Sequence, residues 1–160
     1  MVSFGTRHTL SSQTDQERGI GAALAWGMGE FDEASAACGG CLQARFVEDT
    51  VTGRRIPEPV LIRNALAIQW GSERPNEVVI IQGHIDSRGS DVMDAAVDAP
   101  GANDNASGSA LVIEAARMLS GRRFPTTVVY ALLSGEEQGL YGGRLLADEA
   151  RAQGWTVKAV

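Results

Sequence analysis

The stretch TTVVYALLSGEEQGLYGG, residues 126–143, decides the fold, because an apolar run ends there in front of two adjacent acids. The run Val128–Leu133 is typical of a strand that is covered on both faces. After one serine and one glycine, the carboxylates Glu136 and Glu137 follow directly. Open α/β sheets bind ligands beyond the carboxyl ends of their strands, so this stretch predicts a ligand site after a buried strand.

A second apolar run, EVVIIQG at 77–83, ends in a comparable way. It is followed by a long polar loop from His84 to Asn105 that holds five aspartates. Loops of this length in compact domains usually have a function. Because both runs read as strands of one α/β unit, we expect the two acidic loops to meet at one edge of the sheet.

Helical and strand patterns alternate along the rest of the chain, which predicts an α/β domain with parallel strands and right-handed crossovers. We expect helices at about 15–37, 107–120 and 139–153, and strands at about 41–51, 60–70, 77–83, 126–134 and 155–160, with a turn at 52–59. Apolar residues at helical spacing define the core-facing stripes: Ile20, Ala23, Leu24, Met28 and Phe31 in the first helix, and Leu111, Ala115, Met118 and Leu119 in the second.

Composition bounds the class of protein. The 160 residues suffice for one domain with a proper core, and 44% hydrophobic residues are usual for a globular protein. A net charge of −6 without a Lys/Arg cluster argues against a nucleic-acid partner. No apolar run reaches the 18 or so residues of a membrane span, and the N-terminus lacks the pattern of a signal peptide.

The two cysteines form the motif CGGC, Cys38 to Cys41. Such a motif can be a redox pair or half of a zinc site, but a second pair is absent, which excludes a four-cysteine zinc site in this chain. It follows a helical stretch, unlike a thioredoxin motif. A local disulfide or two ordinary thiols remain as interpretations.

Several polar residues at the strand ends each have an ordinary interpretation. His84 fits a polar strand end, Asp104 or Ser107 could cap the following helix, and two adjacent acids could be a solvated pair. Together, however, an imidazole and carboxylates at one sheet edge suit zinc, or alternatively manganese or cobalt. Asp86 shares a face with His84 in extended chain and can orient the ring.

The adjacent glutamates can divide the work. Neighbouring side chains of an extended segment point to opposite sides, so one of Glu136 and Glu137 can bind metal while the other accepts a proton. Glycines on both sides of the pair let the backbone turn closely around the site.

Three motifs, GHIDS at 83–87, APGANDNASG at 99–108 and LLSGEEQGLYGG at 132–143, resemble those of the co-catalytic di-zinc aminopeptidases. This group contains bacterial leucyl aminopeptidase and aminopeptidase S. The similarity runs from about residue 76 to the end, and FGTRHTLSS and RGIGAALAW also look like the N-terminal part of bacterial members. The resemblance implies a three-layer helix–sheet–helix fold with a mixed, mostly parallel sheet that is truncated at the C-terminus.

The resemblance also implies a set of metal ligands. His84 would ligate one zinc, with Asp86 behind it, Asp104 would bridge two zinc ions, and Glu137 would ligate the second. The peptide bond between Asp104 and Asn105 would be cis, as in relatives.

A catalytic role follows for the remaining acid. Glu136 would be the general base that takes a proton from water and later gives it to the leaving amine. The reaction implied is hydrolysis of N-terminal peptide bonds, with two Zn²⁺ in a complete site and a peptide with a free N-terminus as substrate. Many relatives are secreted or periplasmic, so the resemblance also suggests that location.

The family has five zinc ligands, and this chain does not supply two of them. These two are an Asp after the next strand and a distant His. Asp148 lies in a helical stretch and does not fit, and His8 lies at the wrong end. We therefore expect residues 1–160 to be an incomplete zinc metallopeptidase domain, the N-terminal part of a larger enzyme, with little or no activity by itself.

Three alternatives remain. Carboxypeptidase-like and glutaminyl-cyclase-like enzymes share this motif set, and a non-catalytic domain of the same fold would carry substituted ligands, which this chain does not. A calcium loop could use the aspartates of the long loop, although it lacks compact ligand spacing; these are Asp86, Asp91, Asp94, Asp98 and Asp104. Asp91, Asp94 and Asp98 otherwise read mostly as solvated loop acids.

Overall fold

A mixed five-stranded sheet with the strand order β1-β2-β4-β3-β5 organises the chain, and the computed structural model describes residues 1–160. The expected helices and strands are present, with bounds that differ by a few residues from those expected. The helices are η1 (Val2–Phe4), α1 (Gly19–Ala37), η2 (Ala102–Ala106), α2 (Ser107–Leu119) and α3 (Tyr141–Ala152). The strands are β1 (Gln43–Gly53), β2 (Ile56–Gln69), β3 (Arg74–His84), β4 (Thr126–Leu133) and β5 (Thr156–Ala159).

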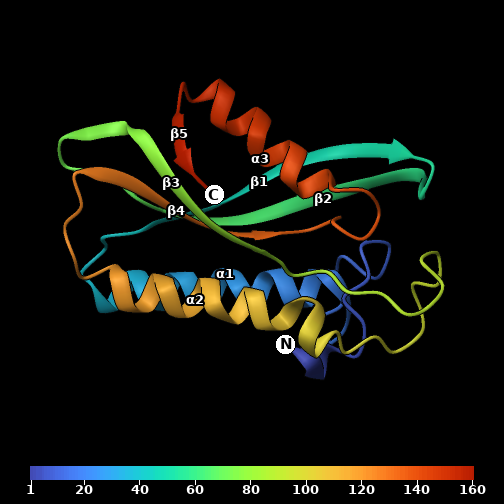
Figure 1. Ribbon diagram of the computed structural model, residues 1–160. Coiled ribbons are helices and arrows are strands. Elements are labelled where there is room, and N and C mark those ends of the chain that lie inside the picture. The colour runs from blue at the N-terminus through green and yellow to red at the C-terminus, as the bar shows by residue number, and fades with distance from the viewer.

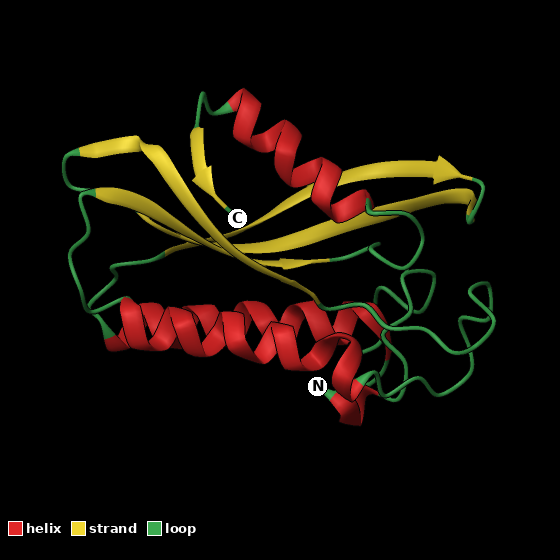
Figure 2. Ribbon diagram, viewed as in Figure 1, coloured by secondary structure: helices red, strands yellow, loops and turns green.

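The helices cover both faces of this sheet. α1 and α2 lie side by side beneath it, and α3 lies above it (Figure 1). β1 and β2 form an antiparallel hairpin, β2 is antiparallel to β4, and β3 runs parallel to both β4 and β5. The predicted α/β fold with three layers and a mixed sheet is therefore confirmed (Figure 2).

β4 explains why the opening stretch is so apolar. Every side chain from Thr127 to Leu133 is buried. Because successive side chains point to opposite faces, Val128, Tyr130 and Leu132 pack toward α1 and α2. Val129, Ala131 and Leu133 belong to the separate core cluster that includes Leu146 of α3. A strand that is buried on both faces cannot alternate apolar and polar residues, so it reads as a continuous apolar run.

The turn expected at 52–59 is present but shorter, at residues 54–55, because β2 already begins at Ile56 and contains Pro57 and Pro59. Proline has no N–H to donate and is tolerated in a strand only where that side lacks a partner. β4 pairs with β2 only over residues 65–69, so the end of β2 that holds the prolines has a neighbour on one side alone.

α1 begins at Gly19 and not at about residue 15. The carboxylate of Asp15 accepts hydrogen bonds from the backbone N–H groups of Glu17 (2.8 Å) and Arg18 (3.0 Å), which stabilises a turn outside the helix.

None of the helices combines the length and the apolar character that a membrane crossing requires.

The stripe expected to face the core on α2 is wrong at two of its four residues, since only Ala115 and Leu119 are partly buried and pack against the core. Leu111 and Met118 are 62% and 75% exposed, whereas Val112, Ile113 and Ala116 are buried. Both sets of residues recur at helical spacing, so periodicity alone could not decide which set faces the core.

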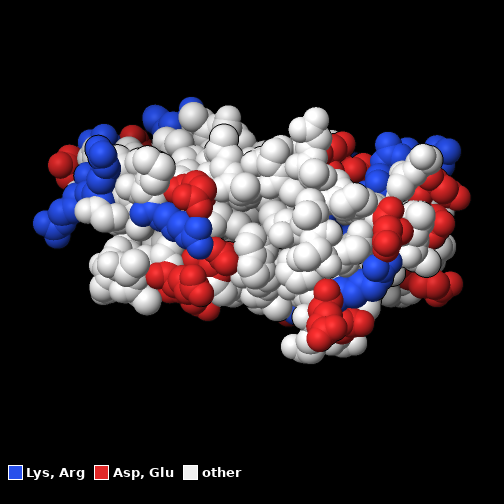
Figure 3. Space-filling view, turned by 90° about the horizontal axis from the view of Figure 1, so that it is seen from below, with Lys and Arg blue, Asp and Glu red and all other residues white.

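Charges on the face formed by α1 and α2 are mixed. Lys and Arg side chains lie beside Asp and Glu side chains on this face, and neither sign forms a continuous patch (Figure 3). Arg117 of α2, for example, pairs with Glu30 of α1 and with Glu114.

The two cysteines form a disulfide, Cys38–Cys41, just after the end of α1. The CGGC motif is therefore a local disulfide in this structure and not two ordinary thiols.

The register of the central strands places the two acidic loops side by side. β3 and β4 are parallel, and His84 at the end of β3 pairs with Leu133 at the end of β4. Both loops therefore begin at the same sheet edge, as the sequence predicts.

Candidate metal centre

Close packing of β3 against α2 fixes the position of His84. A Cβ atom added to Gly83 would lie 2.8 Å from the backbone of Gly108, so only glycine permits this approach. The Ser109 hydroxyl of α2 donates a hydrogen bond to the His84 carbonyl oxygen at 2.9 Å. The last residue of β3 is thereby held against the N-terminal turn of α2.

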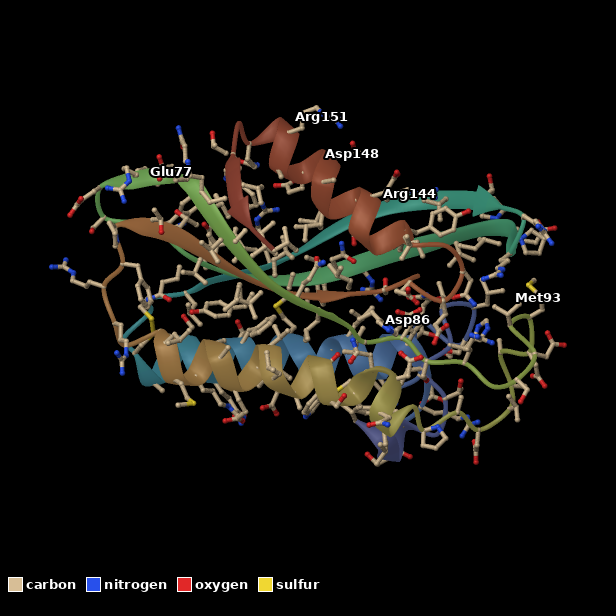
Figure 4. The ribbon with its side chains drawn as sticks, viewed as in Figure 1. Glu77, Asp86, Met93, Arg144, Asp148 and Arg151 are labelled. Carbon is tan, nitrogen blue, oxygen red and sulfur yellow. A yellow bond between two sulfur atoms is a disulfide. The ribbon has the colours of Figure 1, made fainter.

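Polar side chains from three separate segments converge at this edge. Potential ligand atoms of His84, Glu136 and Glu137 all lie within 4.8 Å of one another. Asp104, from the segment before α2, places its Oδ1 3.0 Å from His84 Nε2. The structure thus brings together all four residues that the resemblance assigned to metal binding and proton transfer. Figure 4 places the neighbouring Asp86 among the loops at this end of the sheet.

Asp86 orients the His84 ring, as the sequence predicts. His84 Nδ1 lies 3.2 Å from the Asp86 carbonyl oxygen and 3.4 Å from its carboxylate Oδ1. The other ring nitrogen, Nε2, faces Asp104 and also Glu136, whose carboxylate lies 4.0 Å away. A histidine held through one nitrogen in this way presents the other as a ligand.

The electrostatic environment of His84 favours its charged form. Burial by itself would lower the pKa of His84, but the hydrogen bond and the charge of Asp86, together with the charge of Glu136, raise it to about 9. A cation at this position would replace the proton, because only the neutral ring can ligate a metal.

Asp86 has a second role that the sequence reasoning missed. It is fully buried, and its carboxylate accepts hydrogen bonds from the backbone N–H groups of Glu136 (3.3 Å) and Glu137 (3.1 Å). The same carboxylate accepts a third bond, from the Thr9 hydroxyl at 3.1 Å. Asp86 therefore joins the loop after β3 to the loop after β4.

The two adjacent glutamates differ in their surroundings. The Glu136 side chain is 38% exposed, whereas that of Glu137 is 10% exposed. Gly135, with φ 74°, supplies the left-handed turn that leads into the pair. The sequence suggested separate roles for these acids, and their surroundings are indeed unequal.

The pKa of Glu136 is raised above its ordinary value. Burial is the main cause, and the negative charges of Glu137, Asp86 and Asp104 add to it, while His84 opposes the shift. A carboxylate with a raised pKa is a better proton acceptor than an ordinary glutamate.

Glu137 is held by a residue that the sequence reasoning did not single out. Its carboxylate forms an ion pair with Arg88 at 2.7 Å, and its backbone carbonyl accepts a hydrogen bond from Arg55 at 3.0 Å. Arg88 directly follows the motif at 83–87, which is the signal that could have drawn attention to it.

Asp104 does not cap α2. The side chain of Asn105 accepts the backbone N–H of Gly108 at 2.9 Å, while the Ser107 hydroxyl donates to the Asn103 carbonyl. The cap expected from Asp104 or Ser107 is therefore supplied by Asn105, which leaves the Asp104 carboxylate for His84. The Asp104–Asn105 peptide bond is cis, as the resemblance implies.

The remaining loop aspartates have partners of their own. Asp91 and Asp94 accept backbone N–H groups within their own loop, and Asp98 pairs with Arg18 at 2.6 Å. The His84–Glu136–Glu137 group is the only set of three or more His, Cys, Asp or Glu side chains that is close enough to share an ion. The calcium loop therefore gains no support, and Asp91, Asp94 and Asp98 are surface residues of the loop, as the solvated-acid interpretation has it.

Solved structures share this architecture. The LapA aminopeptidase of Legionella pneumophila superimposes with a TM-score of 0.73 at 23% sequence identity, covering 99% of this chain and 38% of LapA. A glutaminyl cyclase of Fimbriiglobus ruber gives a TM-score of 0.73 at 21% identity, covering 99% of this chain and 56% of the cyclase. At these identities the likeness establishes the fold alone.

Fungal proteins are more similar in sequence. A probable zinc metalloprotease of Pyricularia oryzae is 46% identical over 162 residues, which cover all of this chain and 32% of that protein. Another, of Leptosphaeria maculans, is 47% identical over 150 residues, which cover 92% of this chain and 34% of that protein. The chain thus spans about a third of the length of the curated relatives it matches.

A family model decides the assignment. The model of peptidase family M28 matches residues 64–160, which are more than half of the chain and contain all three motifs. The match confirms the resemblance to zinc peptidases drawn from those motifs. The chain belongs to peptidase family M28.

Proposed function

We propose that this chain forms the zinc-binding and proton-transferring part of an aminopeptidase that hydrolyses N-terminal peptide bonds. The observation that carries the proposal is the convergence of His84 Nε2 with the carboxylates of Glu136, Glu137 and Asp104 at one sheet edge. The family and the names of the fungal relatives support zinc as the metal.

The donor set fits such an ion. One imidazole nitrogen and several carboxylate oxygens match the ligands of zinc in catalytic sites. Without a cation the carboxylates oppose one another's ionisation, which contributes to the raised pKa of Glu136. His84, Asp104 and Glu137 are the residues that we assign as ligands, with two Zn²⁺ in a complete site.

Zinc, when bound, would polarise the scissile carbonyl and acidify water. The residues of the chain supply the rest of the mechanism. Asp86 holds the His84 ring and the backbone of both glutamates in place. Glu136, the more exposed acid, accepts the proton of the attacking water and delivers it to the leaving amine. Glu137, the less exposed acid, would remain a ligand of the metal.

A chimera tests the activity. Residues 1–160 would replace the corresponding third of the Pyricularia oryzae relative, and the products formed from a short peptide would be identified by mass spectrometry. We expect zinc-dependent release of the N-terminal residue from a free peptide and none from its acetylated counterpart. The unaltered relative is the control.

Other products would redirect the assignment. Release of the C-terminal residue would indicate a carboxypeptidase, and loss of ammonia from an N-terminal glutamine would indicate a glutaminyl cyclase. If the chimera is folded and yields no product while the unaltered relative is active, the chain is a non-catalytic domain of this fold. The 160-residue chain alone should show little or no activity, because it supplies three of the family's five ligands.

We further propose a location outside the reducing cytosol, secreted or periplasmic. The Cys38–Cys41 disulfide supports this, because disulfides persist mainly in oxidising compartments. Thiol alkylation of the native protein in its host, followed by mass spectrometry, tests the proposal: unreacted cysteines are expected, and alkylated cysteines would contradict it.

A further inference from the structure

A short N-terminal segment, Thr6–Thr9, is buried although it belongs to no helix or strand. Figure 1 shows the blue N-terminal chain running among the loops at the end of the sheet that carries the metal centre. Arg7 is 0% exposed and is the largest fully buried side chain of the protein. A buried arginine is costly unless each of its donors is satisfied, so its partners indicate its purpose.

The partners of the Arg7 guanidinium are three backbone carbonyls at the start and near the end of the long loop that follows β3. Nε donates to the carbonyl of Ile85 at 2.7 Å. Nη1 donates to Pro100 at 2.7 Å, and Nη2 donates to Gly101 at 3.1 Å. Ile85 lies between His84 and Asp86, and Pro100 and Gly101 shortly precede Asp104. One side chain thus joins the backbone next to two predicted ligands that are twenty residues apart in sequence.

The fit is specific to arginine. A planar guanidinium reaches several acceptors in fixed directions, whereas a lysine ammonium is a single point of charge. A Cβ atom added to Gly101, where φ is 46°, would lie 2.9 Å from Arg7 Nη2, so glycine permits the contact. Two hydrogen bonds also hold the backbone of Arg7. Its N–H donates to Ser87 Oγ at 3.2 Å, and its carbonyl accepts from Ser87 N at 3.3 Å.

The neighbours of Arg7 reach the remaining parts of the site. The Thr9 hydroxyl donates to Asp86 at 3.1 Å. His8 Nε2 lies 3.0 Å from the Val92 carbonyl and 3.1 Å from the side-chain nitrogen of Gln138, which directly follows Glu137. The segment therefore contacts the loop after β3, the segment before α2 and the loop after β4.

We propose that Arg7 is a positioning residue that sets His84 and Asp104 at the separation a metal ion requires, before any ion binds. Arg7 touches neither metal nor substrate and acts through the carbonyls of Ile85, Pro100 and Gly101. The inference rests on the proposed function, in that His84 and Asp104 are taken as ligands.

Gln69 offers a matched control at the other end of the sheet. It is also buried, and its side-chain nitrogen donates to the carbonyls of Leu119, Ser120 and Arg122. Gln69 pairs with Val128 near the start of β4, whereas the metal centre lies beyond the end of that strand. Removing either side chain deprives three carbonyls of a donor, but only Arg7 adjoins predicted ligands.

The experiment measures zinc affinity and unfolding midpoint in the 160-residue chain and in three variants, Arg7→Lys, Arg7→Met and Gln69→Met. Zinc affinity would be determined by competition with a chromophoric chelator. We expect all three variants to unfold at lower temperature than the unaltered chain. Only the two Arg7 variants should bind zinc more weakly, by about tenfold or more, as expected when the residues supporting a metal ligand are removed.

Two results would overturn the inference: zinc affinity of Arg7→Lys and Arg7→Met equal to that of the unaltered chain, or an equal loss in Gln69→Met. If the Arg7 variants are unfolded in buffer, all four proteins are measured in trimethylamine N-oxide, which favours the folded state. Failure of the proposed function has a different signature, because the unaltered chain would then bind no zinc, or His84→Ala would bind it equally well.

Discussion

The adjacent acids Glu136 and Glu137 have different environments because one buried carboxylate, that of Asp86, holds the backbone of both. The Asp86 carboxylate accepts the N–H groups of both Glu136 and Glu137, which fixes the strand end and lets the two side chains diverge. One becomes the better exposed acid with a raised pKa, and the other is paired with Arg88. A single buried aspartate therefore supports both the histidine and the glutamates of the site.

Replacing Asp86 by Asn tests this role at the level of one residue. Loss of the negative charge should lower the pKa of His84 from about 9, since Asp86 is the main cause of its rise. Zinc affinity should also fall, by about 10- to 100-fold, because the ring and the glutamate backbone lose their support. NMR titration of the His84 ring protons and a chelator competition would measure the two effects. An unchanged His84 titration would contradict the account.

The same pKa makes zinc binding depend on pH. Zinc must displace a proton from His84 below pH about 9, so the apparent affinity should rise by about tenfold per pH unit between pH 6.5 and 8.5. In the metal-free chain, His84 stabilises the fold below its unfolded pKa of about 6.5, and this contribution is lost as the pH rises through about 9. Affinity that is flat over this range would mean that His84 is not the ligand.

Arg88 should weaken zinc binding, because its guanidinium already neutralises Glu137. The variant Arg88→Gln is therefore expected to bind zinc more tightly, by up to about fivefold, which corresponds to the roughly 1 kcal/mol that a partly exposed ion pair provides. Arg74→Gln, which removes an exposed pair with Glu77, is the control and should leave the affinity unchanged. Weaker binding in Arg88→Gln would show that the arginine supports the site instead.

At the scale of the elements, the sequence predicted best what is strongly periodic or directly adjacent to a motif. The runs in β3 and β4 and the acids at their ends were identified because burial on both faces leaves a continuous apolar pattern. The exposed stripe of Leu111 and Met118 was mistaken for the core face, since spacing does not reveal which face meets the sheet. The segment Thr6–Thr9 was missed as structure, because a buried coil held by side-chain bonds to distant carbonyls has no periodic pattern.

The orientation of α2 can be tested with a pair of variants. Ile113→Ala should lower the free energy of unfolding by about 2–4 kcal/mol, because the side chain is 3% exposed and would leave a cavity. Leu111→Ala removes a 62% exposed side chain and should change it by no more than about 0.5 kcal/mol. Urea unfolding gives both values. A larger loss for Leu111→Ala than for Ile113→Ala would mean that the helix is turned the other way.

At the scale of the whole molecule, side-chain hydrogen bonds hold the chain at both ends of the central strands of the sheet. The candidate metal centre lies beyond the carboxyl ends of β3 and β4, whereas Gln69 of β2, which pairs near the start of β4, anchors the end of α2 through three carbonyls. Because the proposed ligands come from three segments and no single segment holds them together, metal binding should be a property of the folded chain. Zinc should therefore stabilise the fold, by about 2.7 kcal/mol at a hundredfold excess over Kd.

The central claim is that Glu137 is a metal ligand and Glu136 the base. It is tested most directly by the thermal unfolding midpoint with and without zinc, in the unaltered chain, Glu136→Gln and Glu137→Gln. The account predicts that zinc raises the midpoint of the unaltered chain and of Glu136→Gln by the same several degrees, and that Glu137→Gln loses the shift. A shift that disappears in Glu136→Gln and persists in Glu137→Gln would contradict it.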